Sequence, residues 1–189
     1  MLLRPSGALS CPARAQTPAT RPPVPKTETE TAPVRDGVRL AVDMGSVRIG
    51  VARSDPGGIL ASPLTVVRSG PSELDELAAL VASADAIEVI VGLPTSLSGQ
   101  EGIAASAARG FAAELAGLLA PIPVRLVDER FTTTQAHDAL RESGKDSRAR
   151  RPVVDAAAAA VLLQAALDTE RATGRPPGQL VALTRGADA

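Results

Sequence analysis

The chain has 189 residues, and its 20 Lys and Arg side chains nearly balance its 21 Asp and Glu side chains, giving a formal net charge of −1. The charge is unevenly distributed, because residues 1–36 and 171–189 each carry +2 and residues 37–170 carry −5. Proteins that bind nucleic acid through general electrostatic attraction have basic domains. The composition therefore restricts any nucleic-acid contact to a local site.

The rarer residue types exclude several further classes of protein. Aromatic residues make up 1% of the chain, which excludes a surface on which several aromatic side chains stack on bases. The single Cys and the single His exclude a disulfide framework and a Cys/His zinc cluster. No apolar run approaches the ~18–20 residues that span a bilayer, so we expect no membrane contact and a cytoplasmic protein.

The prolines divide the chain into a tail and a domain. Seven of the 16 prolines lie before residue 37, and this density opposes packing, so residues 1–36 are expected to form a disordered Pro-rich N-terminal tail. The alternative is a start codon assigned upstream of the true one. Residues 37–170 have the length of one ordinary domain, and residues 171–189 are expected to form a flexible C-terminal tail.

The first part of the domain is predicted to form an antiparallel three-strand meander. Residues 38–43 alternate apolar and polar side chains, and residues 48–55 and 59–67 flank the turn sequence Asp55-Pro56-Gly57-Gly58. A helix capped by Ser72 follows, and its periodicity gives it one apolar face. That face comprises Leu74, Leu77, Ala78 and Val81.

The second part of the domain alternates strands with helices. Strands are predicted at 86–91 and 122–127, and the Gly/Ser/Thr-rich segment 94–102 is predicted to be a loop. Helices are expected to begin at Ile103, Thr132 and Val153. The first of these places four apolar residues at four-residue spacing, namely Ile103, Ala107, Phe111 and Leu115. The predicted fold class is α/β, a mixed sheet flanked by helices in which the antiparallel meander is followed by parallel strands.

Carboxylates fall at comparable places in this arrangement. Asp43 ends the first strand, and Asp155 lies in the first turn of the closing helix. Asp128 and Glu129 end the last strand. In an α/β sheet, the carboxyl ends of strands and the adjoining helix N-termini gather at one edge. Carboxylates that gather there repel one another, and a hard cation such as Mg²⁺ or Mn²⁺ relieves that repulsion and can activate water for phosphodiester hydrolysis.

Each of these features also has a purely structural interpretation. Asp43 is compatible with a turn residue, Asp155 with a helix-dipole contact, and residues 128–130 with a solvated loop. The segment 144–151 holds four cations and one acid. It is either a solvated loop or a phosphate clamp that supplies the positive charge that the domain lacks.

Four segments together resemble the YqgF (RuvX-type) family of RNase H-like proteins. They are LAVDMGSVRIGVARSD (40–55), IVGLPTSLSGQEG (90–102), VRLVDERFTT (124–133) and the basic loop leading to VDAAAAAVLL (154–163). The combination of VGLP and DERFT in this order is specific, whereas D-x-G alone is weak. The family is associated with nucleases for the 5′ end of pre-16S ribosomal RNA and is also described as Holliday-junction resolvase-like.

The resemblance implies an RNase H-like fold with the first strand at the centre of the sheet. It implies that Asp43, Glu129 and Asp155 are catalytic and hold Mg²⁺ or Mn²⁺, with Asp128 as the other candidate for the place of Glu129. Strand alternation points Asp128 and Glu129 to opposite faces, so only one faces the metal, and we favour Glu129. Resolvases of the wider superfamily carry an acid after the fourth strand, where this chain has Gly92-Leu93-Pro94.

The residues themselves suggest the nucleic-acid contacts. Cations next to the acidic positions are expected to meet backbone phosphates, and the backbone N–H groups of residues 95–101, with the hydroxyls of two serines there, are expected to line the substrate groove. These residues are Arg130, Lys145, Arg148, Arg150, Arg151, Ser96 and Ser98.

The leading hypothesis is a hydrolase, a metal-dependent nuclease that acts on structured RNA, processing the 5′ end of pre-16S rRNA in the pre-ribosome as a monomer or homodimer. One alternative is a non-catalytic nucleic-acid-binding ribosome-assembly factor, which the missing fourth-strand acid motivates. Another is a Holliday junction resolvase that acts on branched DNA. The pattern Asp43-x-Gly45-Ser46 also resembles the phosphate loop of actin-like kinases, but those proteins need two such domains.

Overall fold

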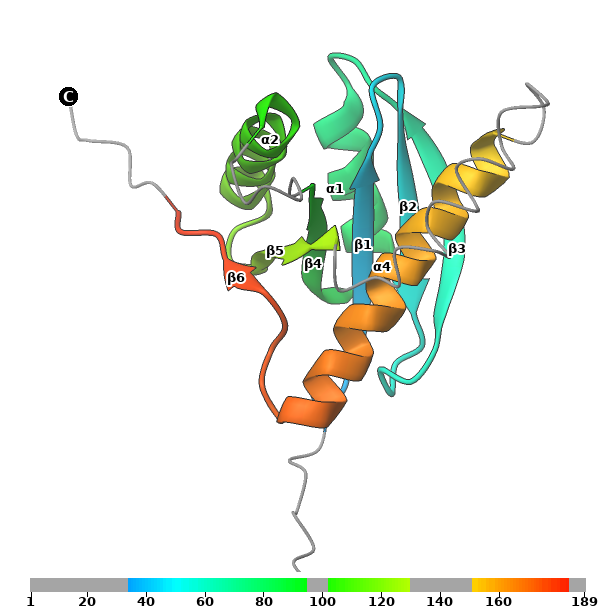
Figure 1. Ribbon diagram of the computed structural model, residues 1–189, viewed down its shortest axis with the longest axis vertical. Coiled ribbons are helices and arrows are strands. Elements are labelled where there is room, and N and C mark those ends of the chain that lie inside the picture. The colour runs from blue at the N-terminus through cyan, green and yellow to red at the C-terminus, as the bar shows by residue number, and fades with distance from the viewer. Residues whose placement is uncertain (1–33, 95–101, 130–150, 184–189) are drawn as a thin grey trace, which may run out of the picture. The chain divides into compact units, whose positions relative to one another are not determined.

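The computed structural model describes residues 34–94, 102–129 and 151–183, and these residues build a six-stranded sheet (Figure 1). The order across the sheet is β3-β2-β1-β4-β5-β6, so β1 lies near the centre. The strands are β1 (Val38–Met44), β2 (Arg48–Ser54), β3 (Ala61–Arg68), β4 (Ala86–Leu93), β5 (Val124–Asp128) and β6 (Gln179–Leu180).

The sheet is mixed, as predicted. The strands β1, β2 and β3 pair antiparallel, whereas β4 runs parallel to both β1 and β5. The α/β class, the three-strand meander and the RNase H-like arrangement of the sheet are therefore confirmed. The predicted boundaries of the first five strands differ from the observed ones by at most two residues at each end.

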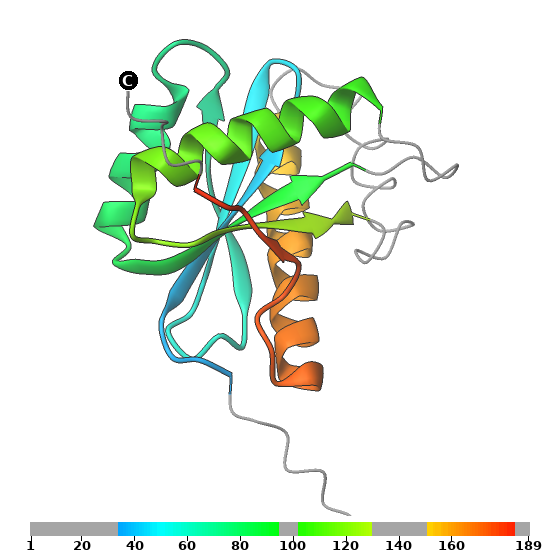
Figure 2. The same ribbon diagram turned by 90° about the vertical axis from the view of Figure 1, so that its left-hand side faces the viewer.

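Helices cover both faces of the sheet (Figure 1 and Figure 2). The helices α1 (Glu73–Ser83) and α2 (Ile103–Leu119) pack on one face, and α4 (Arg151–Thr173) crosses the other. Each face has its own hydrophobic core, and the central strands β1 and β4 are almost wholly buried because both of their faces are covered. In the part of the chain that the structure describes, no helix is long and apolar enough to cross a membrane.

The alternation of side chains along β1 decides which face each residue occupies. Leu40 and Val42 belong to the core under α1 and α2, whereas Ala41 belongs to the core under α4. Since successive side chains in a strand point to opposite faces, Asp43 shares the α4 face with Ala41. This register places a carboxylate at the carboxyl end of a central strand, beneath α4.

The turn between β2 and β3 is built around the carboxylate of Asp55. This carboxylate accepts hydrogen bonds from the backbone N–H groups of Gly57 at 3.0 Å, Ile59 at 2.7 Å and Leu60 at 2.6 Å. These bonds, with that from Leu60 the strongest influence, hold the pKa of Asp55 below its ordinary value. The turn that was predicted at residues 55–58 thus has its own internal stabilisation.

Two local predictions about the helices need correction. Ser72 precedes α1 but makes no side-chain cap to a backbone N–H, and its hydroxyl lies 3.1 Å from Glu76 Oε1 instead. In α2, Phe111 and Leu115 are buried, but Ile103 is 93% exposed. Strict four-residue spacing drifts around a helix of 3.6 residues per turn, so a row followed over three steps leaves the buried face.

The apolar face predicted for α1 is observed, and the buried face of α2 follows alternating spacings of three and four. Leu77 and Val81 of α1 are buried, with Leu74 and Ala78 packed against the same core. The buried residues of α2 are Ala105, Ala108, Phe111, Ala112, Leu115, Ala116 and Leu119.

The segment after residue 170 contributes to the sheet. The helix α4 continues to Thr173, and β6 pairs antiparallel with β5, where Val181 N–H donates to Val124 O at 2.9 Å. The expected flexible tail therefore contains an ordered part. A two-residue strand has too short an alternation to be recognised in a sequence, which explains why it was not predicted.

A buried ionic cluster joins the sheet to the C-terminal end of α4. Arg39 and Glu88 are fully buried, and Glu170 is 2% exposed. Glu170 accepts from Arg35 Nε at 2.8 Å and from Arg39 Nη2 at 3.1 Å. Glu88 accepts from Arg35 Nη2 at 2.8 Å and from Arg125 Nε at 2.7 Å. We refer to these five residues as the basal ionic cluster.

Candidate active site

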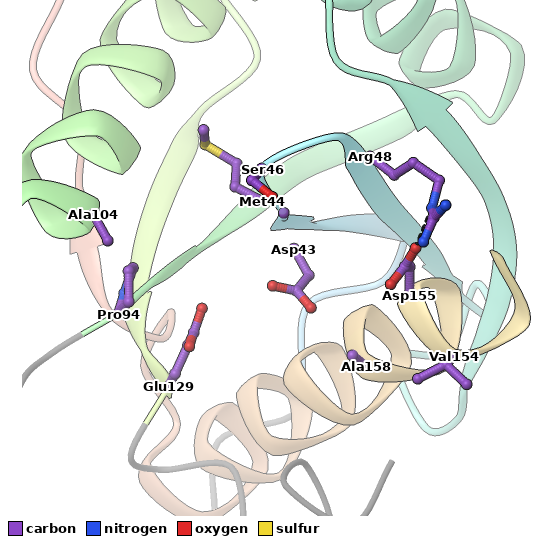
Figure 3. A pocket seen from close by; sticks show the side chains of 11 residues that line it. Asp43, Met44, Ser46, Arg48, Pro94, Ala104, Glu129, Val154, Asp155 and Ala158 are labelled. Atoms are coloured by element: carbon purple, nitrogen blue, oxygen red, sulfur yellow. Dashed lines mark hydrogen bonds and ion pairs between the residues drawn. The ribbon is translucent and has the colours of Figure 1, made fainter. Parts of the chain in front are cut away.

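A polar pocket with a volume of about 410 Å³ lies where β1 ends and α4 begins (Figure 3). Its walls come from the β1–β2 turn, the ends of β4 and β5, and the beginnings of α2 and α4. The described lining residues are Asp43, Met44, Gly45, Ser46, Arg48, Pro94, Ala104, Glu129, Val154, Asp155 and Ala158. This is the sheet edge at which the sequence predicted that carboxylates gather.

Asp43 occupies the middle of the pocket. It is the penultimate residue of β1, is 6% exposed, and lies between Glu129 and Asp155 in Figure 3. Its position is set by strand pairing on both sides, because β2 and β4 flank β1. A carboxylate fixed in this way can orient a ligand without first being ordered itself.

At the end of β5, the side chains of Asp128 and Glu129 lie on opposite faces of the sheet. Val127 packs in the core under α4, so Glu129, two residues further on, faces the same side and lines the acidic pocket. Asp128 faces the same side of the sheet as Leu126, which belongs to the core under α1 and α2. It lines a different pocket, next to Leu126 and Gly178. The structure thus brings Glu129, and not Asp128, together with Asp43.

Asp155 enters the pocket from the first turns of α4 and is held by Arg48. The Nε of Arg48 donates to Asp155 Oδ2 at 2.6 Å, and the two side chains are 28% and 32% exposed. Arg48 begins β2, and nothing in the sequence marks it as a site residue. It is one of 20 Lys and Arg residues, and no spacing in the sequence marks the pair that it makes across 107 positions.

The three carboxylates supply oxygen ligands, but they are not clustered as they stand. Within the described ranges, no three His, Cys, Asp or Glu side chains form a group that could hold a metal ion. Gly92-Leu93-Pro94 carries no acid, as the sequence indicated. The side chain of Glu129 lies over this strand end instead: a Cβ at Gly92 would be only 2.9 Å from Glu129 Oε1.

The predicted phosphate contacts lie mostly outside the described residues. This applies to Arg130, Lys145, Arg148, Arg150, Ser96 and Ser98, and also to the predicted helix from Thr132. Arg151 begins α4, but its side chain is not described. Pro94 and Glu129 line the pocket and are the last described residues before 95–101 and 130–150.

The mixed sheet in the order described, with carboxylates at the carboxyl end of its central strand, defines an RNase H-like α/β protein with an acidic site. The chain belongs to the family described as RuvX: Holliday junction resolvase, whose model matches residues 37–169.

Sequence relatives each match more than three quarters of the chain. A protein of Thermobifida fusca is 61% identical over 155 residues, which are 78% of this chain and 98% of that protein. A protein of Nocardioides sp. is 54% identical, with 78% and 98% covered, and one of Streptomyces coelicolor is 55% identical, with 77% and 89% covered. All three carry the name "Putative pre-16S rRNA nuclease".

Among solved structures, that of Thermus thermophilus RuvC in complex with a Holliday junction substrate is similar to this chain. The TM-score is 0.48 at 18% sequence identity, with 72% of this chain and 97% of that chain covered.

Proposed function

We propose that this protein is a divalent-metal-dependent nuclease that hydrolyses phosphodiester bonds at the 5′ end of pre-16S rRNA. The observation that carries the proposal is the meeting of Asp43, Glu129 and Asp155 in one pocket, from three different elements of the fold. The relatives named above support the choice of substrate, because they are named for this activity and are 54–61% identical to this chain over 77–78% of its length.

The donor set of the pocket suits a hard divalent cation. The described lining offers three carboxylates and neither His nor Cys, and Mg²⁺ and Mn²⁺ take oxygen ligands. When bound, such an ion supplies an activated water and offsets the charge that develops on the phosphate oxygens. For ligation, the carboxylates of Glu129 and Asp155 have to turn toward Asp43, and Asp155 has to leave Arg48.

The chain's own residues then divide the work by their burial. Asp43 is buried and held by the sheet, so it fixes where the reacting phosphate lies. Glu129 and Asp155 are less buried, and each can change its side-chain conformation without disturbing a core. Arg48, once separated from Asp155, has a guanidinium beside the pocket that can donate to a phosphate oxygen.

The charge of the pocket predicts how substrate binding depends on the ion. Its described lining carries three carboxylates and one guanidinium, so it repels a polyanion in the absence of metal. The cations proposed to contact phosphates lie in the sequence between Glu129 and Asp155; they are Arg130, Lys145, Arg148, Arg150 and Arg151. RNA affinity is therefore expected to require both the divalent ion and these cations.

The test compares two substrates with the full-length wild-type protein. A pre-16S rRNA 5′ fragment and a four-way DNA junction are each incubated with Mn²⁺, with Mg²⁺ and with EDTA. We expect metal-dependent cleavage of the RNA and none in EDTA, with tighter RNA binding when metal is present. Cleavage of the junction alone would replace RNA processing with junction resolution, the activity in the family's description.

A non-catalytic binding protein is the second candidate, since no three of the described His, Cys, Asp and Glu side chains form a group that could hold a metal ion as they stand. Salt-dependent RNA binding without cleavage under any of the metal conditions would favour it. Junction resolution also requires two coordinated cuts, which symmetric dimers usually provide, so the same samples should be sized in solution.

Replacing Arg48 by Gln is expected to raise the affinity for Mn²⁺ by roughly two- to fivefold. The ion pair between Arg48 and Asp155 is partly exposed, and such pairs contribute up to ~1 kcal/mol, which is the amount that metal binding no longer has to overcome. Isothermal titration of Mn²⁺ into wild type and Arg48→Gln measures the change.

The matched control is Arg53→Gln, because Arg53 is exposed on the same strand and does not line the pocket. Weaker Mn²⁺ binding by Arg48→Gln than by this control would show that the guanidinium organises the carboxylates and does not compete with the ion.

A further inference from the structure

Two glycines flank Asp43 in the sheet. In β2, Gly50 is the direct antiparallel partner of Asp43. In β4, Gly92 follows Val91, which pairs with Val42, so it lies beside Asp43 on the other side. Asp43 faces α4, and its two neighbours in this row of the sheet carry no side chain on that face.

The space over Gly50 is filled by the backbone of α4. A Cβ built on Gly50 would overlap the carbonyl oxygen of Asp155 and would lie 2.5 Å from its carbonyl carbon and 3.2 Å from Ala156 N. These atoms belong to a helix and cannot rotate away. Any side chain at position 50 would therefore push the beginning of α4, and Asp155 with it, away from Asp43.

The space over Gly92 is filled by a side chain. A Cβ built there would lie 2.9 Å from Glu129 Oε1, 3.6 Å from Glu129 Cγ and 3.2 Å from Leu162 Cδ2. Both neighbours are ends of flexible side chains, so a methyl group can be accommodated. The accommodation displaces the carboxylate of Glu129 from its place over Gly92, on the side of the sheet that Asp43 faces.

We propose that Gly50 and Gly92 are positioning residues of the acidic site, which clear the sheet on either side of Asp43 so that the carboxylates of Asp155 and Glu129 can approach it. Gly50 sets the distance of the helix, and Gly92 sets the conformation of Glu129. The inference rests on the proposed function for the metal site and for its catalytic consequence, whereas the close approaches are properties of the fold.

The experiment measures Mn²⁺ binding by isothermal titration and thermal unfolding of the full-length protein. For Gly92→Ala we expect Mn²⁺ affinity to fall by about tenfold, at the lower end of the effects seen when groups that orient metal ligands are changed. The melting temperature should stay near that of wild type, since only side-chain ends have to move. For Gly50→Ala we expect a larger loss of affinity together with a lower melting temperature.

The control is Gly110→Ala in α2, where a Cβ would meet nothing within 4 Å. Alanine is the better helix former, so this variant should melt at the same temperature as wild type or higher and should bind Mn²⁺ equally well. If Gly50→Ala does not fold, Gly92→Ala alone decides the outcome.

A double-mutant cycle separates positioning from general destabilisation. The shorter side chain of Glu129→Asp leaves room for a methyl group at position 92, so the two changes together should cost less affinity than the sum of the single changes. Additive losses, or wild-type Mn²⁺ affinity in Gly92→Ala, would overturn the proposal, as would a wild-type protein that binds no Mn²⁺.

Cleavage assays on the same samples keep this inference distinct from the proposed function. Loss of Mn²⁺ affinity in Gly92→Ala without RNA cleavage by wild type would support the positioning role and reject the nuclease. Equal Mn²⁺ affinity and equal RNA cleavage by wild type and Gly92→Ala would do the reverse.

Discussion

Asp43→Asn is expected to reduce metal-dependent cleavage by about 10³-fold, the scale on which the loss of one preorganised electrostatic contact slows an enzyme. Asp43 is the most central of the three carboxylates, and because it is only 6% exposed, water cannot readily take over its role as a ligand. Asparagine keeps the shape of the side chain but removes the charge that attracts a divalent ion. Cleavage of a labelled RNA fragment under single-turnover conditions, with Mn²⁺, measures the effect.

The same variant should fold as well as wild type or better. It removes one of three negative charges from a pocket in which Arg48 lies against Asp155, so repulsion within the pocket decreases. The control Asp75→Asn changes an exposed acid on α1 and should leave both cleavage and melting temperature unchanged. Cleavage at the wild-type rate by folded Asp43→Asn would remove the proposed site.

Glu170→Ala is expected to have the largest effect on stability, with a loss of roughly 3–5 kcal/mol in the free energy of unfolding. Glu170 is buried near the end of α4, and its removal would leave the guanidinium of Arg39 buried without the carboxylate to which it donates a hydrogen bond. Urea unfolding of both proteins measures the difference. The control Asp168→Ala breaks an exposed pair with Arg171 and should cost less than about 1 kcal/mol.

The pH dependence of this difference has a definite sign. Burial alone would raise the pKa of Glu170, but the hydrogen bonds from Arg35 and the charges of Arg39 and Arg35 outweigh it and hold the pKa below its ordinary value. A carboxylate with a lowered pKa stabilises the fold above its unfolded pKa, about 4.3, and loses that contribution as the pH falls through the folded pKa. The gap between wild type and Glu170→Ala should therefore narrow in acid. A gap that is constant with pH would contradict the ionic origin of the effect.

The parts of this molecule that depend on local patterning could be read from its sequence. The alternation in residues 38–43 and the turn at 55–58 predict the meander, because both are determined by neighbours in the chain. The same alternation predicted that only one of Asp128 and Glu129 faces the metal, and in the structure Val127 packs under α4, which puts Glu129 on that side. Asp43, Glu129 and Asp155 then meet because strand ends and a helix start share one edge of the sheet.

Contacts between distant segments could not be predicted in this way. Arg39 and Glu88 lie in strands, and charged residues are ordinarily exposed. Both are fully buried here because each has an ion-pair partner in the basal ionic cluster: Arg39 pairs with Glu170, and Glu88 pairs with Arg35. The pair of Arg48 with Asp155 and the roles of Gly50 and Gly92 depend on how closely α4 approaches the sheet. No periodicity in the sequence predicts the distance between α4 and the sheet.

On the proposed function, the packing of α4 on the sheet is the step that completes the acidic site. The core on its side of the sheet is completed by Leu162, Leu163 and Leu167, and the same helix carries Asp155 at its beginning and Glu170 near its end. A nascent chain that has been synthesised only as far as Glu129, the residue after β5, contains Asp43 and Glu129 but neither their third carboxylate nor the cover over Ala41 and Ile90. On the proposed function, a nuclease built in this order has no complete site while its own C-terminal helix is still inside the ribosome that made it.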